Sequence, residues 1–444
     1  MTDSHIPGRA IGDARAGSQS GGGSQSGAGS QSGAGSRQGR GGSRRVARAS
    51  SGPRDCLPLV SVLIPVRNER DFLASCLDSV LANTYPAERI EILAIDGASD
   101  DGSRRILESY AARFPGLRVL ENPKTSTPAA LNLGIREARG DVIVRLDAHA
   151  RLAPDYIAQC VDWLRISGAD NVGGAMRTLP RGRGLVAEAI AVTLSHRFGV
   201  GGSAFRTAPQ KPCWTDTVFG GCYRREVFER VGEFNERLPR GQDLEFNLRL
   251  KRVGGRTLLV PSIHCDYFAR SEWWPFLRHN WTNGVWAIRP FSESAIVAIR
   301  PRHLAPLGFV LLLVAAVAAW RVPLDVVPFA QMLSAEVSAA TVFGAAISGT
   351  AISGTTISGT AALGATGAGP WPLLALVACY LTAAAVAAID AARRRGGARV
   401  VLLLPAVFAG LHLAYGLGSL WGLFVSAPAI AGRGLGLTER FHKP

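Results

Sequence analysis

The stretch DVIVRLDAHA (141–150) decides how the first half of the chain is interpreted. DVIVRL is a short apolar run typical of a buried strand, and Asp147 and His149 follow directly after it. A carboxylate and an imidazole at the end of an apolar strand cost burial free energy unless something binds them. In an open α/β sheet, ligands lie just beyond the carboxyl ends of the strands. Asp147 and His149 are therefore candidate metal ligands, with a simple capped turn as the alternative.

Apolar strands and amphipathic helices alternate around this stretch. LVSVLIPV (59–66), IEILAID (90–96) and LRVLE (117–121) are strand-like, and helical patterns separate them. Such alternation predicts an α/β domain with a doubly wound, mostly parallel sheet covered by helices on both faces. Residues 168–270 are less regular, and we assign them to the completion of the same domain.

Charge and cysteine usage narrow the class of protein. The formal net charge is +15, but the arginines are spread over the tail, the loops and the edges of the apolar segments. This distribution argues against a nucleic-acid partner and fits anionic membrane lipid. The seven cysteines are odd in number and contain no CxxC pair, so they indicate neither a disulfide framework nor a zinc site. Reduced thiols in a cytoplasmic domain are expected.

Apolar runs in the last third predict membrane attachment. WWPFLRHNWTNGVW begins at Trp273 and combines tryptophan with basic residues, as membrane-interface segments do; an aromatic core cluster is the alternative. The runs at 304–320, 371–390 and 400–425 are long enough to span a bilayer. Three spans, rather than four with an extra one inside 324–347, place the arginines that flank them on the same side as the large domain.

These observations divide the chain into five parts. The expected parts are a disordered Gly/Ser/Arg-rich tail (1–57), the α/β domain (58–270), an aromatic and basic interfacial segment (271–303), a membrane region with about three helices (304–428) that includes a low-complexity loop (321–370), and a second tail (429–444).

Three polar motifs fall where strands are expected to end. Asp96 can accept a hydrogen bond from the imide N–H of a uracil-like base, Asn68 and Glu69 can hold a ribose, and Asp147 can bind a cation on a diphosphate. Each motif alone also fits an ordinary turn, but together they suit a nucleotide with a bound metal. The motifs are PVRNE (65–69), DGASDDGS (96–103) and DAH (147–149).

Together with NLGIREARGD and RGQDLEFNLRL, these motifs resemble the successive signatures of family 2 glycosyltransferases, which have the GT-A fold. The resemblance covers about residues 59–290 and is strongest to the membrane-attached enzymes of exopolysaccharide assembly, of the succinoglycan-biosynthesis type. It implies an inverting, single-displacement transfer from a nucleotide-diphospho-sugar. The sugar and its acceptor are not specified by these motifs.

The resemblance also implies roles for individual residues. Asp243 in RGQDLEF matches the family's catalytic base, and its place at a helix start favours the ionised carboxylate. Asp147 takes the first position of the family's Asp-x-Asp metal motif. The substrate-binding set consists of Pro65, Arg67, Asn68, Glu69, Asp96, Asp147, Gly220, Gly221 and Gln242.

The metal motif departs from the usual pattern, because His149 replaces the second aspartate. Some relatives use Asp-x-His, so a divalent cation is still expected. Carboxylate ligands suit Mg²⁺, whereas an imidazole moves the preference toward Mn²⁺. Relatives often place a further metal-binding histidine near His264, which follows the strand-like TLLVPSI, and a hydrogen-bonded histidine at a strand end is the alternative.

The expected function is transfer of a sugar, a hexose from a UDP donor, to a lipid-linked or polysaccharide acceptor. The expected location is a multi-pass attachment to the cell membrane, with the catalytic domain in the cytoplasm beside membrane lipid and other polysaccharide-assembly proteins. Three alternatives stay open: a non-catalytic nucleotide-binding membrane scaffold, a processive polysaccharide synthase and a polyprenyl-phosphate sugar synthase.

Overall fold

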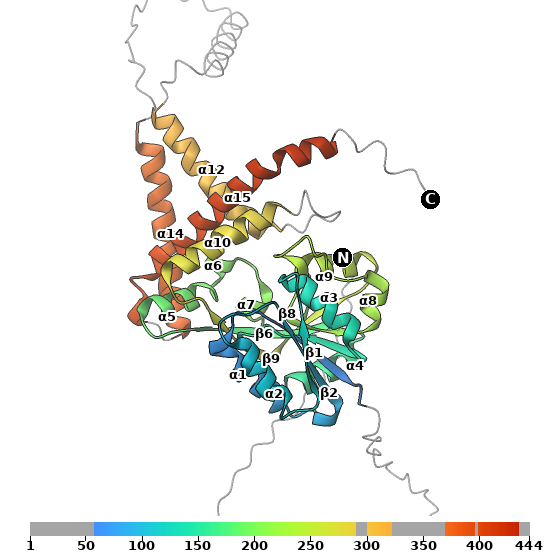
Figure 1. The fold of residues 1–444 in the computed structure, drawn as a ribbon. Coiled ribbons are helices and arrows are strands. Elements are labelled where there is room, and N and C mark those ends of the chain that lie inside the picture. Colours follow the sequence, from blue (N-terminus) through green and yellow to red (C-terminus); the bar gives the residue numbers. More distant parts are fainter. Residues whose placement is uncertain (1–56, 290–299, 322–368, 396–397, 435–444) are drawn as a thin grey trace, which may run out of the picture. The chain divides into compact units, whose positions relative to one another are not determined.

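The computed structural model describes residues 57–289, 300–321, 369–395 and 398–434 (Figure 1). The expected N-terminal tail, nearly all of the expected loop 321–370 and the last ten residues lie outside these ranges. The described chain begins with an α/β domain and continues into long apolar helices.

One sheet runs through the described α/β domain in the order β3-β2-β1-β4-β8-β6-β9-β5, with β7 paired to β9. The pairs β1–β2, β1–β4 and β2–β3 are all parallel, as the alternation of strands and helices in the sequence predicts. β8 runs antiparallel to β4 and β6, so the irregular second half mixes strand directions. The strands are β1 (Val60–Val66), β2 (Ile90–Asp96), β3 (Leu117–Glu121), β4 (Val142–Arg145), β5 (Ala150–Leu152), β6 (Asn171–Pro180), β7 (Cys213–Thr215), β8 (Phe219–Arg224) and β9 (Thr257–Ala269).

Helices cover the sheet because its central strands are apolar on both faces. Leu63 and Ile143 pack against α3, α8 and α9, where Phe246 is fully buried. Val62 and Val144 alternate with them, point to the other face and are also buried. The helices of the domain are α1 (Arg70–Leu81), α2 (Ser103–Ala111), α3 (Thr127–Glu137), α4 (Tyr156–Ser167), α5 (Leu185–Thr193), α6 (Arg197–Val200), α7 (Ala204–Thr207), α8 (Glu226–Val231) and α9 (Gln242–Arg252), with a short 3-10 helix, η2, at Ala87–Arg89.

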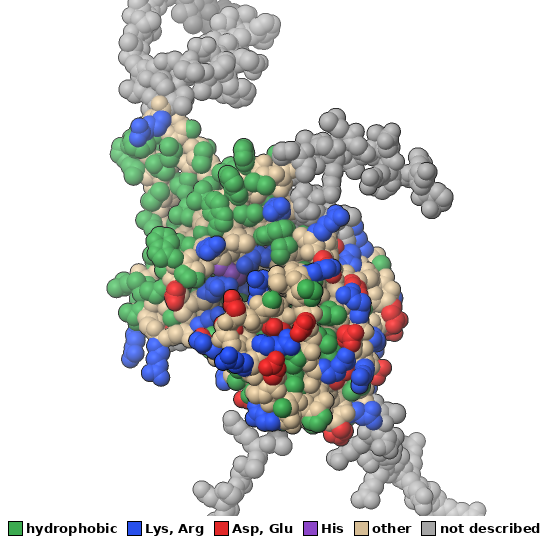
Figure 2. Space-filling view, in the orientation of Figure 1, with side chains coloured by type: hydrophobic (Ala, Val, Ile, Leu, Met, Phe, Trp, Pro, Cys, Tyr) green, Lys and Arg blue, Asp and Glu red, His purple; other side chains and the backbone are tan. Residues whose placement is uncertain are grey.

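Three of the described helices are long and apolar enough to cross a membrane, which confirms the three expected runs. They are Pro301–Arg321, Trp371–Arg394 and Leu404–Ala427, within α12 (Pro301–Arg321), α14 (Trp371–Arg395) and α15 (Leu404–Gly434). Their outward faces carry exposed apolar side chains such as Leu312 and Leu381, and Figure 2 shows apolar side chains gathered over this region.

Within the expected interfacial segment (271–303), Trp273–Ile288 form α10, which packs along α15. Residues 290–299 lie outside the described ranges, and the last three residues of the segment belong to α12. Glycines permit the close approach: a Cβ on Gly284 would lie 2.0 Å from the carbonyl oxygen of Tyr415. A separate apolar cluster joins Ile190 of α5 to Phe408 of α15, with the 3-10 helix η4 (Ala398–Val400) at its edge. These contacts hold the end of the α/β domain against the apolar helices.

Candidate active site

The turn between β4 and β5 presents Asp147 and His149. The backbone N–H of Ala150 donates to the carbonyl of Asp147 (2.9 Å), which closes the turn. Leu146 and Ala148 are buried, whereas the side chains of Asp147 and His149 are only half-buried. The turn and the half-buried polar pair therefore coexist, and the turn positions Asp147 and His149.

Arg145, the last residue of β4, joins two carboxylates that are far apart in the sequence. Its Nη2 lies 2.9 Å from Oδ1 of Asp147, and its Nη1 contacts Oδ2 of Asp243. Arg145 lies on the same face of the sheet as Ile143, the face that α9 covers. Asp243 is the second residue of α9. The structure thus brings Asp147 and Asp243 to opposite ends of one guanidinium group.

Asp243 has the environment of a proton acceptor. Its side chain is 28% exposed. Its Oδ1 atom is buried and has no hydrogen-bond partner among the described residues. Burial raises the pKa of Asp243 above its usual range, while the positive charge of Arg145 acts in the opposite direction. Asp243 therefore keeps one carboxylate oxygen without a protein partner, which makes it a candidate to accept the proton of a substrate hydroxyl.

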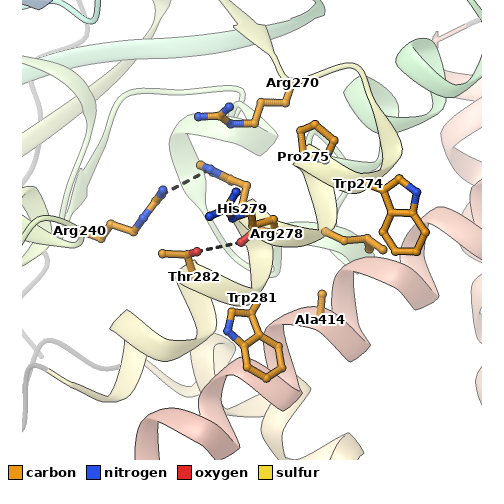
Figure 3. Close-up of a pocket in the computed structure, with 10 residues that line it drawn as sticks. Arg240, Arg270, Trp274, Pro275, Arg278, His279, Trp281, Thr282 and Ala414 are labelled. Carbon is orange, nitrogen blue, oxygen red and sulfur yellow. Dashed lines mark hydrogen bonds between the residues drawn. The ribbon is translucent and has the colours of Figure 1, made fainter. Parts of the chain in front are cut away.

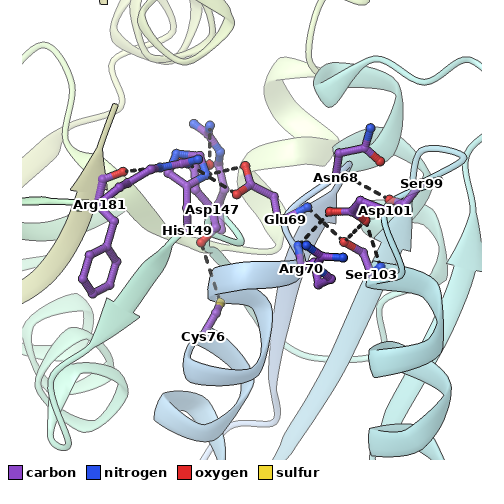
Figure 4. A network of polar contacts seen from close by, with 12 residues as sticks. Asn68, Glu69, Arg70, Cys76, Ser99, Asp101, Ser103, Asp147, His149 and Arg181 are labelled. Atoms are coloured by element: carbon purple, nitrogen blue, oxygen red, sulfur yellow. Dashed lines mark hydrogen bonds and ion pairs between the residues drawn. The ribbon is translucent and has the colours of Figure 1, made fainter. Parts of the chain in front are cut away.

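His149 is oriented by Glu69. Its Nδ1 lies 2.8 Å from Oε1 of Glu69, and the other carboxylate oxygen of Glu69 lies 3.4 Å from Nη2 of Arg181 (Figure 4). Burial alone lowers the pKa of His149, but Tyr267, Glu69 and Asp147 together raise it to about 9. No described residue hydrogen-bonds Nε2 of His149. Metal-binding histidines commonly have this arrangement, with a carboxylate on one ring nitrogen and the other nitrogen free.

His264 does not join Asp147 and His149. The apolar run TLLVPSI predicts a strand that ends near His264, but β9 continues to Ala269. His264 therefore lies in mid-strand, where its Nδ1 contacts the carbonyl of Ser262 (3.2 Å) and its side chain lines a different pocket with Asp78 and Arg177. The β9 residue next to His149 is Tyr267, whose ring centroid is 4.9 Å from the imidazole centroid. No group of three or more metal-ligand side chains occurs among the described residues.

The loops that follow β1 and β2 are tied to each other. The side-chain amide of Asn68 donates to Asp100 (2.8 Å) and its oxygen accepts from the backbone N–H of Asp100 (3.0 Å). The backbone N–H of Asn68 donates to the hydroxyl of Ser99 (3.1 Å) (Figure 4). Asn68 and Glu69 were expected to hold a ribose, but in this structure Asn68 braces the loop and Glu69 orients His149. Asp96 is buried at the end of β2, accepts from Ser99 (3.3 Å) and lies 3.8 Å from Arg104.

The other expected substrate-binding residues lie along the same edge of the sheet. Pro65 is the last but one residue of β1, and the exposed Arg67 donates to the carbonyl of Thr125 (3.4 Å). Gly220 has a φ of +73°, and a Cβ there would lie 3.2 Å from the carbonyl oxygen of Arg145. Gly221 follows it in β8, and Gln242 is buried at the start of α9, beside Asp243.

Two cavities adjoin this edge. One, of about 660 Å³, is lined by Asp243 and Phe219 from the α/β domain and by Arg302, Phe309 and Tyr380 from the apolar helices. The other, of about 820 Å³, lies along α10 and is lined by basic and aromatic side chains (Figure 3). Arg240 borders both cavities. The edge that carries Asp243 is therefore continuous with space between the apolar helices.

Comparison with known proteins identifies the family of the α/β domain. Residues 61–232 match the family model described as Glycosyl transferase family 2. The chain carries a family 2 glycosyl transferase domain. The match spans β1 to α8 and so includes the strand ends that carry Asp96, Asp147 and His149, while Asp243 lies shortly beyond it. The domain and its glycosyltransferase relatives make the chain a glycosyltransferase, of the GT-A-like fold that the sequence motifs implied.

Curated relatives of the glycosyltransferase come from bacteria and archaea. The succinoglycan biosynthesis protein ExoA of Rhizobium meliloti is 29% identical over 265 residues, which cover 58% of this chain and 78% of that protein. A dolichyl N-acetyl-alpha-D-glucosaminyl phosphate 3-beta-D-2,3-diacetamido-2,3-dideoxy-beta-D-glucuronosyltransferase of Methanococcus voltae is 29% identical over 234 residues, covering 51% and 72%.

Among solved structures, a mannosyltransferase of Pyrobaculum calidifontis in complex with GDP-Man and Mn²⁺ is similar to this glycosyltransferase, with a TM-score of 0.46 and 20% sequence identity. The similarity covers 83% of this chain and 88% of that one.

Sequence reasoning missed several residues at the edge of the glycosyl transferase domain. Arg145 stands in the quoted RLDAHA motif, and an arginine that ends an apolar strand needs an acidic partner, so a signal was present. Arg240 begins the RGQDLEF motif, and its position three residues before the expected base Asp243 was a comparable signal. Tyr267 and Arg181 carry none, because their positions depend on the length and register of β9 and β6.

Proposed function

We propose that this glycosyltransferase transfers a sugar, with inversion, from a nucleotide-diphospho-sugar to a lipid-linked saccharide at the cytoplasmic face of the cell membrane. The single observation that supports it most is the placement of Asp243. Asp243 lines a cavity that continues between the apolar helices, one of its carboxylate oxygens has no partner among the described residues, and the other shares Arg145 with Asp147. The UDP-hexose donor is part of the proposal, since Asp96 suits the imide of a uracil.

In the proposed reaction, Asp243 accepts the proton of an acceptor hydroxyl as that oxygen attacks the anomeric carbon of the donor. The bond from the anomeric carbon to the diphosphate breaks on the opposite face, and the nucleoside diphosphate leaves on the side of Asp147. The positive charge of Arg145 reduces the repulsion between the two carboxylates, and its ion pair with Asp243 holds that side chain in place. The single displacement gives inversion because attack and departure occur on opposite faces of the sugar.

A divalent cation fits the residues that are present. Asp147 offers a carboxylate and His149 offers Nε2, with Glu69 on its other nitrogen. A Mn²⁺ or Mg²⁺ ion commonly takes only one or two protein ligands and completes its shell with substrate phosphates and water. When bound, such an ion stabilises the negative charge of the departing diphosphate. His264 is not included in this set, because it lies within β9 and lines another pocket.

Two findings favour a lipid-linked acceptor over a free sugar. Three helices could cross a membrane, and the cavity beside Asp243 reaches them. The names of two relatives connect those proteins to succinoglycan biosynthesis and to a dolichyl phosphate substrate. The scaffold alternative is weaker because a scaffold has no need of Asp243. In a polyprenyl-phosphate sugar synthase the attacking phosphate is already anionic, so it would not need a general base either.

The proposed function is tested with the full chain in membranes. Labelled nucleotide sugars are supplied one at a time, with and without Mn²⁺, and label in the lipid-extractable fraction is measured. We expect one UDP-hexose to give metal-dependent incorporation. If no donor releases its nucleoside diphosphate, the scaffold alternative is favoured.

A further inference from the structure

A closed chain of contacts surrounds His149. Its Nδ1 lies 2.8 Å from Oε1 of Glu69, and Oε2 of Glu69 lies 3.4 Å from Nη2 of Arg181 (Figure 4). Nε of Arg181 donates to the backbone carbonyl of Phe268 (3.0 Å), and the backbone N–H of Phe268 donates to the carbonyl of His149 (3.1 Å). The four residues come from four separate segments of the chain, so each contact constrains the others.

Arg181 is held in place by contacts of its own. It directly follows β6, and its backbone N–H donates to the hydroxyl of Ser271 (2.7 Å). Its guanidinium carbon lies 4.7 Å from the centroid of the Phe72 ring, and the rings of Phe72 and Phe268 are 5.1 Å apart between centroids. A guanidinium group that lies over an aromatic ring and is bonded through Nε has few other orientations. Arg181 therefore presents Nη2 to Glu69 from a fixed position.

Glu69 is the one acid that pairs with Arg181 in the described part of the chain. The side chains of Arg181 and Glu69 are 25% and 15% exposed, so solvent competes little for this contact. Arg177, which lies four residues earlier on β6, instead pairs with Asp266 at 2.6 Å and is 59% exposed. Of these two arginines, only Arg181 therefore acts on the carboxylate beside His149.

The carboxylate group of a glutamate turns easily, because the last torsion of its side chain has broad preferences. A single partner on one oxygen does not fix it. In Glu69, His149 lies on Oε1 and Arg181 lies on Oε2. The backbone of Glu69 is also held, since its N–H donates to the hydroxyl of Ser103 (2.9 Å). Arg181 thus fixes the plane of the carboxylate that orients the imidazole.

We propose that Arg181 is a positioning residue for the divalent-cation site: it fixes the carboxylate of Glu69, and that carboxylate holds the imidazole of His149 so that Nε2 is left for the cation. The inference rests on the proposed function, because that proposal places the cation on Asp147 and His149. Arg181 pairs with Glu69 rather than with either ligand. Its effect on the cation must therefore disappear when residue 69 carries no carboxylate.

The inference is tested by titrating Mn²⁺ into the purified full-length chain in detergent, with free and bound ion distinguished by electron paramagnetic resonance. We expect Arg181→Met to bind Mn²⁺ about tenfold more weakly, the lower end of the loss that follows removal of an outer partner of a metal ligand. Arg181→Lys keeps the charge without the fork of donors and should lose less. Arg177→Met removes an arginine that pairs with Asp266 and should bind Mn²⁺ like the parent chain.

A double-mutant cycle separates positioning through Glu69 from a general effect on the fold. In Glu69→Ala there is no carboxylate to fix, so the addition of Arg181→Met should cause no further loss of Mn²⁺ affinity. A purely structural role of Arg181 would lower the affinity by the same factor in both backgrounds and would overturn the proposal. If the methionine variant does not fold, the same cycle is completed with Arg181→Lys.

The ligand variant His149→Ala distinguishes failure of this inference from failure of the proposed function. If His149→Ala weakens Mn²⁺ binding and Arg181→Met does not, the cation site stands and the role of Arg181 is wrong. If His149→Ala has no effect, the cation site of the proposed function is wrong and this inference falls with it. Mn²⁺ binding needs no sugar transfer, so an affinity that depends on Arg181 and Glu69 in a chain that transfers no sugar would leave this inference standing.

Discussion

The guanidinium group of Arg145 lies between Asp147 and Asp243, 2.9 Å from the first and in contact with the second. Only 11% of the Arg145 side chain is exposed, so solvent screens this arrangement little. The positive charge of Arg145 therefore offsets the negative charges of both Asp147, the expected metal ligand, and Asp243, the expected base. Arg145 acts on Asp243 as a positioning residue whose charge also affects when that carboxylate ionises.

Replacing Arg145 should move the pH dependence of transfer. Arg145 lowers the pKa of Asp243 against the effect of burial, so its removal raises that pKa and leaves the base protonated at higher pH. For Arg145→Met we expect the acid limb of kcat/KM to move upward by roughly one to three pH units, as for loss of a close opposite charge. The measurement is a pH profile of transfer, with Arg145→Lys as the charge-retaining control. A lower maximal rate with an unmoved acid limb would refute this role.

His149 and its partner Glu69 should control metal affinity. Removal of the imidazole in His149→Ala should weaken Mn²⁺ binding strongly, and Glu69→Gln should weaken it by about 10- to 100-fold because the ring loses its orienting carboxylate. Titration of Mn²⁺ followed by electron paramagnetic resonance measures both. His264→Ala is the matched control, since His264 lines another pocket. If His264→Ala lowers the affinity and His149→Ala does not, the assignment of ligands is wrong.

The packing of α10 on α15 should tolerate no side chain at Gly418. A Cβ there would lie 2.2 Å from the carbonyl oxygen of Trp281, which is closer than real Cβ atoms approach. We expect Gly418→Val to lower the free energy of unfolding by about 1–3 kcal/mol, the usual cost of overpacking. Thermal unfolding in detergent measures it, with Gly308→Ala on α12 as control because nothing lies within 4 Å of a Cβ at that position. Equal melting temperatures for Gly418→Val and the parent would contradict the packing described.

Much of the fold could be predicted because it follows from local periodicity. The apolar strands around Leu63 and Ile143, the amphipathic helices between them and the three long apolar helices all appear where the sequence indicates. The strand ends that carry Asp96 and Asp147 were predictable for the same reason, since the carboxyl ends of parallel strands share one edge of a sheet.

What could not be predicted depends on pairing between distant segments. The pairing of β9 with β6 shifts register between Gly174 and Ala175, and β9 then continues past His264, so Tyr267 rather than His264 meets His149. No local sequence pattern predicts such a shift in register. The same holds for Glu69, which the sequence assigned to a ribose and which the structure places on His149.

The most direct measurement compares Asp243→Asn with the parent chain for both transfer and donor binding. Loss of a positioned base should lower the rate of transfer by about 10²- to 10⁴-fold, while UDP affinity in the presence of Mn²⁺ stays as in the parent. Asp216→Asn, which alters an acid paired with Lys251 and Arg300, is the matched control and should transfer normally. Transfer by Asp243→Asn at the rate of the parent would show that the proton acceptor lies elsewhere and that the proposed chemistry at this edge of the sheet is wrong.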